Sequence, residues 1–122
     1  YRFMTECDME KHYAGLREIY RKKCSLMLDN MDKYFSAKVT YTKPEGGLFI
    51  WATLPDGSNM MDFCTKAVRD YKIAVVPGTA FGDCGEGFIR ISYAYSLDNL
   101  KEALDRMERY ITGLRGGNNG EA

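Results

Sequence analysis

Apolar residues recur at helical spacing in the first third of the chain. Successive apolar positions between residues 9 and 34 are three or four residues apart, which places them on one side of a helix: Met9, Tyr13, Leu16, Tyr20, Cys24, Met27, Met31 and Tyr34. The other faces carry charged residues, which we interpret as a solvated surface: Glu10, Lys11, Arg17, Glu18, Arg21, Lys22 and Asp29. The pattern predicts a long amphipathic helix.

The hydrophobic period changes to two after Ser36. Val39 and Tyr41 alternate with polar residues, and residues 43–47 carry the Pro and Gly of a turn before an apolar run at 48–52. Two adjacent strands, forming a hairpin, are therefore expected. Because the second run is apolar at every position, it is predicted to be a central strand covered on both faces.

Short apolar segments and helical patterns alternate through the rest of the chain. Ser58 is placed to cap a helix at about 59–71, strands are expected at 73–76 and 87–94, and Ser96 is placed to cap a final helix from residue 97 to 114. The order α-β-β-α-β-β-α predicts an α+β two-layer sandwich, with helices packed on a small, mostly antiparallel, four-stranded sheet. Residues 1–115 are expected to form one domain, and the polar tail 116–122 to be disordered.

The charge balance argues against several kinds of partner. Lys plus Arg and Asp plus Glu number 17 each, so no net field favours nucleic acid or anionic lipid. No apolar run approaches the ~20 residues of a membrane-spanning helix, and a signal peptide is not evident. We expect a cytoplasmic protein that binds neither nucleic acid nor membrane, and a start at Tyr1 suggests a fragment of a longer protein.

Few residues suggest chemistry of their own. The four cysteines, Cys7, Cys24, Cys64 and Cys84, are widely separated and are expected to be free, mostly buried thiols. His12 has no second histidine or nucleophile motif near it, so neither a metal site nor a catalytic residue is assigned. The glycine-rich segment 82–87 carries two carboxylates and precedes a strand, which favours a plain connection over a phosphate loop.

Arg90 is the most informative polar residue. In the predicted strand it shares a face with Phe88 and Ser92, whereas Ile89 and Ile91 point the other way. Spacing alone favours a polar strand face with the arginine stem packed against it.

Three sequence blocks in a fixed order change this interpretation. They read KPEGGLFIW at 43–51, VVPGTAFG at 75–82 and FIRISYA at 88–94. Together they resemble the carboxy-terminal small domain of the class I and II, fold-type I, pyridoxal-phosphate-dependent aminotransferases, over roughly residues 8–112. Within that family, the first two blocks look most like the aminoadipate, kynurenine and broad-specificity group.

The resemblance implies a role for two residues. Arg90 matches the arginine that grips the substrate α-carboxylate, and Phe81 is placed either to shape the side-chain pocket or only to pack at its mouth. The family's cofactor lysine and phosphate-binding residues belong to the large domain, so no cofactor-binding residue is assigned here. The implied partners are that large domain, an amino acid and a 2-oxo acid. The parent is expected to be a homodimer containing pyridoxal phosphate, and this domain alone to be inactive.

Two other hypotheses fit the same sequence. Some bacterial transcription regulators join a DNA-binding domain to an aminotransferase-like effector domain, whose small domain would show similar blocks. A free-standing α/β module that binds small molecules is the second alternative. The sequence upstream in the parent protein would distinguish these hypotheses.

Overall fold

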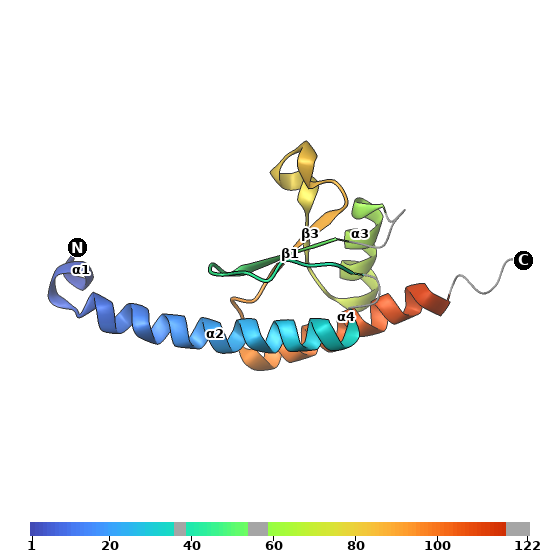
Figure 1. Cartoon of the computed structure of the whole chain (residues 1–122). Helices are drawn as coiled ribbons and strands as arrows, with labels where there is room; N and C mark the ends of the chain where they lie inside the picture. Colours follow the sequence, from blue (N-terminus) through green and yellow to red (C-terminus); the bar gives the residue numbers. More distant parts are fainter. Residues whose placement is uncertain (36–38, 54–58, 117–122) are drawn as a thin grey trace, which may run out of the picture.

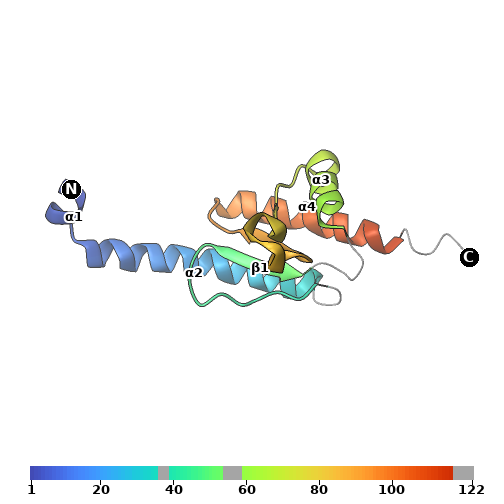
Figure 2. The ribbon, with the colours of Figure 1, turned by 90° about the horizontal axis from the view of Figure 1, so that it is seen from above.

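The computed structural model describes residues 1–35, 39–53 and 59–116, and within them the fold is α+β, as predicted. Helices and strands follow the order α1 (Arg2–Glu6), α2 (Met9–Tyr34), β1 (Phe49–Thr53), α3 (Met60–Tyr71), β2 (Val76–Pro77), the short 3₁₀ turns η1 (Gly78–Phe81) and η2 (Asp83–Gly85), β3 (Phe88–Ser92) and α4 (Leu97–Gly116). α2 and α4 lie beneath one face of the sheet, and η1 and η2 stand above the other (Figures 1 and 2). Gly116, predicted to begin a disordered tail, is instead the last residue of α4, and the rest of the predicted tail, residues 117–122, lies outside the described part.

The sheet has three strands in the described part, not the predicted four. The strands are antiparallel in the order β1-β3-β2, so β3 is central and Trp51 of β1 lies directly opposite Arg90 of β3. The expected strand at 39–42 forms only an isolated bridge between Tyr41 and Ala52, with two further backbone hydrogen bonds around it. Pro44, which follows, has no N–H to extend such pairing.

Two other strand predictions also need correction. The strand expected at 73–76 is reduced to Val76–Pro77, because the backbone N–H of Ile73 donates to the carbonyl of Ala67 and keeps the chain beside α3. β1 is covered on one face only: Ile50 and Ala52 are buried, whereas Phe49 on the other face is 42% exposed. The uniform apolar run therefore does not mark a strand buried on both faces.

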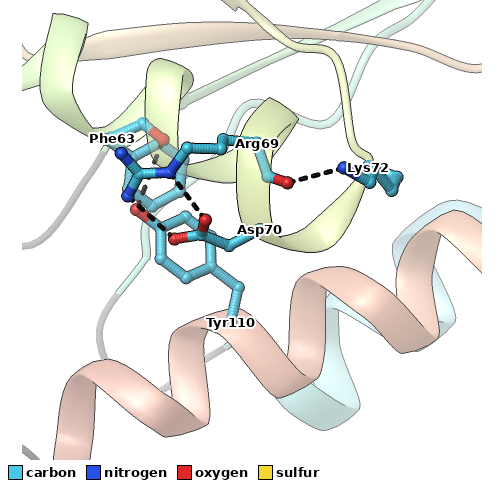
Figure 3. A network of polar contacts seen from close by, with 5 residues as sticks. All are labelled: Phe63, Arg69, Asp70, Lys72 and Tyr110. Atoms are coloured by element: carbon cyan, nitrogen blue, oxygen red, sulfur yellow. Dashed lines mark hydrogen bonds and ion pairs between the residues drawn. The ribbon is translucent and has the colours of Figure 1, made fainter.

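The hydrophobic core lies between the sheet and the helices. Its buried side chains come from α2, β1, α3, β3 and α4, and include Met27, Met31, Ile50, Phe63, Ile89, Leu104 and Met107. Figure 3 shows the junction of α3 with α4, where the Tyr110 hydroxyl donates to the carbonyl of Phe63 at 3.3 Å. On the outside of this junction, Arg69 donates two hydrogen bonds to the carboxylate of Asp70, at 2.7 and 3.1 Å, and so holds its pKa below the ordinary value.

Helix α2 is longer than the layer it covers. Its 26 residues span about 39 Å, whereas a five-residue strand spans about 17 Å. Met27 and Met31 are buried against the sheet, but Tyr13 is exposed and Leu16 is only partly buried on the half that projects towards α1 (Figure 1). The apolar stripe predicted from the sequence therefore packs against the core only from Tyr20 onwards.

The helix caps follow the sequence closely. The Ser96 hydroxyl accepts a hydrogen bond from the Asn99 N–H at 3.3 Å, as predicted. At α3 the cap is Asn59, whose side chain accepts hydrogen bonds from the backbone N–H groups of Met61 and Asp62, and the predicted cap Ser58 lies outside the described residues.

The four cysteines are free, but Cys7 and Cys84 are exposed, so the expectation that most are buried is wrong for these two.

Candidate functional site

The face of the sheet opposite α2 and α4 carries an arginine among aromatic rings. Ile50, Ala52 and Ile89 are buried on the inner face of the sheet. Because side chains alternate along a strand, their neighbours lie on the outer face: Phe49 and Trp51 on β1, Phe88 and Arg90 on β3. The Trp51 and Phe88 rings stack with centroids 5.4 Å apart. The predicted alternation around Arg90 is thus confirmed.

Phe81 reaches this outer face from the loop between β2 and β3. It is the last residue of η1, and its ring lies edge-on to Trp51 at a centroid distance of 5.9 Å. The guanidinium carbon of Arg90 lies 4.6 Å from the centre of the Phe81 ring and 4.1 Å from the centre of the Phe49 ring. The structure therefore brings together Arg90 and Phe81, the two residues singled out in the sequence. We refer to Phe49, Trp51, Phe81, Phe88 and Arg90 as the arginine cluster.

The contribution of Phe49 and Trp51 was missed at the sequence level. Both lie in the apolar run that the sequence pattern predicts to be a strand covered on both faces, and this prediction leaves their side chains no exposure. A signal was nevertheless present, because the larger, aromatic residues occupy alternate positions of β1 and the smaller aliphatic ones lie between them. In a strand covered on one face only, such alternation separates the two faces.

The guanidinium of Arg90 keeps its hydrogen-bond donors available. Its side chain is half-buried, and it forms no hydrogen bond or ion pair with any residue that the structure describes. Aromatic rings attract a guanidinium through its face, whereas its N–H groups point outwards in its plane. The arrangement can therefore orient Arg90 without occupying the two parallel donors that match a carboxylate.

A cavity of about 470 Å³ adjoins the arginine cluster. Arg90, Phe49 and Tyr95 contribute to its wall, and Leu100 and Leu104 of α4 form its apolar side. It lies where residues 73–75 lead from α3 into β2, and Ile91 and Ser92 also line it. A carboxylate bound at Arg90 would thus have apolar surface next to it.

Other residues considered in the sequence are not in this cluster. His12 is exposed on the first half of α2, with its ring 5.0 Å from that of Phe3. Residues 82–87 contain η2 (Asp83–Gly85) and lead into β3, so the expected strand follows them. In the described part, no three His, Cys, Asp or Glu side chains are grouped as metal ligands, and no helix is both long and apolar enough to cross a membrane.

Comparison with known sequences gives a consistent result. The family model "aminotransferase class I and II" matches residues 4–107. LL-diaminopimelate aminotransferase of Maridesulfovibrio salexigens is 33% identical over 101 residues, which are 82% of this chain and 25% of the relative. Aspartate aminotransferase of Pyrococcus abyssi is 35% identical over 105 residues, 85% of this chain and 24% of the relative.

Solved structures agree with these sequence matches. The aromatic aminotransferase from Pyrococcus horikoshii superposes with a TM-score of 0.79 at 32% identity, covering 86% of this chain and 28% of that one. The α-aminoadipate aminotransferase LysN from Thermus thermophilus, complexed with N-(5'-phosphopyridoxyl)-L-leucine, gives 0.80 at 32% identity, covering 88% and 28%. The chain spans about a quarter of the length of the curated relatives it matches.

Proposed function

Because the chain belongs to the class I and II aminotransferase family, we propose that it is the small domain of a pyridoxal-phosphate-dependent aminotransferase in which Arg90 binds the substrate α-carboxylate. The observation that carries this proposal is the guanidinium of Arg90, held over two aromatic rings with its donors available. The substrates are an α-amino acid and a 2-oxo acid, the chemistry shared by this family. Both kinds of molecule carry a carboxylate attached to the carbon that bears the amino or oxo group.

Arg90 acts by position and charge. Its planar fork forms two parallel hydrogen bonds with a carboxylate, which fixes both the location and the rotation of the substrate. The surrounding rings of Phe49 and Phe81 exclude water on one side, and a charged pair is stronger where water is excluded. A substrate held in this way presents its Cα atom in one orientation, which lowers the entropic part of the barrier.

The described residues do not fit pyridoxal phosphate. The lysine that lines the cavity near Arg90 is Lys72, and its ammonium group donates to the carbonyl of Arg69 at 2.8 Å. The arginine cluster offers aromatic carbon and one guanidinium, with no acidic partner for a pyridine nitrogen. We therefore assign the cofactor, which withdraws electrons from the substrate when bound, to the large domain of the parent enzyme. This chain alone is expected to be inactive.

The exposed apolar residues suggest where the rest of the enzyme lies. Phe3 and Met4 of α1 and Tyr13 and Ile19 of α2 are exposed on the part of the molecule that projects beyond the sheet (Figure 1). Apolar surface of this kind commonly marks an interface. We propose that the large domain packs here, and we expect the whole enzyme to be a cytoplasmic homodimer.

The two alternative hypotheses have less support. The relatives and solved structures described above are named as aminotransferases, which favours an enzyme over a transcription regulator or a free-standing binding module. Their named substrates differ, so the proposal goes no further than the shared amino acid and 2-oxo acid chemistry.

The proposal is tested by changing Arg90 to Leu in the full-length enzyme. Charged hydrogen bonds contribute about 1.5–3 kcal/mol each, so losing two should lower kcat/KM on the order of 100-fold or more. The cofactor absorbance should stay unchanged. Arg109→Leu is the matched control, because Arg109 is an exposed arginine of α4 that pairs with Asp105. Normal catalytic efficiency in Arg90→Leu would rule out the carboxylate role.

A further inference from the structure

The loop that carries Phe81 is closed at its base. Residues 78–87 leave the sheet after Pro77 and return to it at Phe88, and the register of β2 with β3 pairs Pro77 with Ile89 (Figure 1). Gly82 and Gly87, with φ of +133° and +83°, turn the chain within this loop. Side chains are rarely tolerated in these backbone regions, so the path of the loop depends on glycine.

Gly78 and Gly85 touch each other where the two arms of the loop meet. A Cβ atom added to Gly78 would lie 2.1 Å from the carbonyl oxygen of Gly85, and one added to Gly85 would lie 2.1 Å from the carbonyl oxygen of Gly78. Both glycines are buried, and the neighbouring atoms are backbone, which cannot turn aside. Any larger residue must therefore push η1 and η2 apart by roughly 1 Å.

Such a displacement would reach Phe81 directly. Gly78 is the first residue of η1 and Phe81 the last, so one turn of 3₁₀ helix separates them. The Phe81 ring is 54% exposed and is held on the sheet by its contacts with Trp51 and Arg90. Its position over Arg90 thus depends mainly on the backbone that carries it.

We propose that Gly78 and Gly85 are positioning residues for substrate binding: their contact closes the loop and sets the Phe81 ring over the guanidinium of Arg90. The guanidinium of Arg90 lies over the face of the Phe81 ring, and this contact leaves its N–H donors free. The ring therefore restricts the guanidinium to orientations that can receive a carboxylate. This inference rests on the proposed role of Arg90. It adds that carboxylate affinity is controlled by two glycines that do not touch the substrate.

The test compares Gly85→Ala with Phe81→Leu in the full-length, cofactor-loaded enzyme. The probe is 3-phenylpropionate, a carboxylate that lacks the amino group and cannot react. Each variant should raise its Kd about tenfold, and should raise the KM of the amino acid similarly while changing kcat by less than about threefold. The double variant should be no weaker than Phe81→Leu alone, because both changes remove the same contact.

A second readout follows the ring itself. Trp51 is the single tryptophan of this chain and lies edge-on to Phe81, so its emission in the 122-residue chain should shift to longer wavelength when Phe81 moves away. Gly46→Ala is the matched control, since a Cβ at Gly46 meets nothing within 4 Å. It should leave the Kd of the probe and the emission of Trp51 unchanged.

The outcomes separate this inference from the proposed function. If Arg90→Leu does not weaken binding of 3-phenylpropionate, the proposed carboxylate site is wrong. If Arg90→Leu does weaken it but Gly85→Ala and Phe81→Leu do not, only the positioning role is wrong. Should Gly85→Ala fail to fold, Phe81→Leu still decides, because an unchanged Kd in that variant would contradict the role of the ring. Additive effects in the double variant would also overturn the inference.

Discussion

The guanidinium carbon of Arg90 lies 4.1 Å from the centre of the Phe49 ring, across two neighbouring strands. The two residues are not directly opposite, because Arg90 pairs with Trp51 and Phe49 pairs with Ser92. They are diagonal neighbours on one face of the sheet, within reach of long and aromatic side chains. The register of β1 against β3 therefore sets where the Phe49 ring lies relative to Arg90, the residue proposed to bind the substrate carboxylate.

Replacing Phe49 with Ala should weaken substrate binding in the full-length enzyme. A cation–π contact at a partly exposed site contributes about 0.5–1 kcal/mol, so the KM of the amino acid should rise roughly two- to fivefold. Steady-state kinetics with both substrates would measure the effect. Val68→Ala is a suitable control, since Val68 is exposed on α3 and belongs neither to the arginine cluster nor to the proposed interface with the large domain. An unchanged KM in Phe49→Ala would show that the ring does not orient Arg90.

Arg90→Lys should recover only part of the activity that Arg90→Leu loses. Lysine restores the positive charge but offers a single ammonium group, which cannot form the planar pair of parallel bonds. We expect kcat/KM to lie about tenfold or more below the wild-type value and above that of Arg90→Leu. If lysine restores full efficiency, charge alone is sufficient and the two-bond geometry is unnecessary.

The purified 122-residue chain should neither bind pyridoxal phosphate specifically nor catalyse transamination. Lys72, which lines the cavity beside the arginine cluster, is engaged with the carbonyl of Arg69, and the ring contacts of the cluster involve no acidic group. Titration with the cofactor, followed by absorbance and mass spectrometry, would check this. Saturable imine absorbance traced to one lysine would contradict it, whereas scattered adducts on several surface lysines would not.

Tyr41 should make the stability of the chain depend on alkaline pH. Its hydroxyl donates to the carboxylate of Asp32 on α2, and burial together with this hydrogen bond raises the pKa of Tyr41 to about 12. A pKa raised on folding contributes stability below the unfolded value near 10, and this contribution is lost as the pH rises from about 10 to 12. Urea unfolding from pH 8 to 12 should show the loss in the wild type and a smaller loss in Tyr41→Phe. Equal pH profiles would rule out this linkage.

Ile50→Ala should strongly destabilise the chain. Ile50 is fully buried in β1, and removing a large aliphatic side chain from a packed core costs about 2–5 kcal/mol. Chemical unfolding followed by circular dichroism would measure the change in the free energy of unfolding. Val68→Ala, at an exposed position of α3, should cost less than about 1 kcal/mol. Similar losses in both variants would indicate that Ile50 is not part of a packed core.

Local patterns explain why much of the fold was predictable. The three long helices α2, α3 and α4 were identified from the spacing of their apolar residues, and the cap at Ser96 from the type of residue that precedes the helix, whereas the short helix α1 was not predicted. The face carrying Phe88 and Arg90 followed from the period of a strand. Each of these features depends on residues close together in the chain. The family blocks added the expectation that Arg90 and Phe81 serve one site.

The remaining features depend on contacts between distant residues. The sequence by itself determined the three long helices and the two faces of β3, and the family resemblance added Arg90 as the candidate ligand. Only the tertiary structure decided that residues 39–42 make a single bridge, that the first half of α2 extends beyond the sheet, and that Phe49 is exposed beside Arg90. It also decided that Gly78 and Gly85 meet. An apolar residue has the same local pattern whether a second layer covers it or not, so its burial is fixed only when the layers pack.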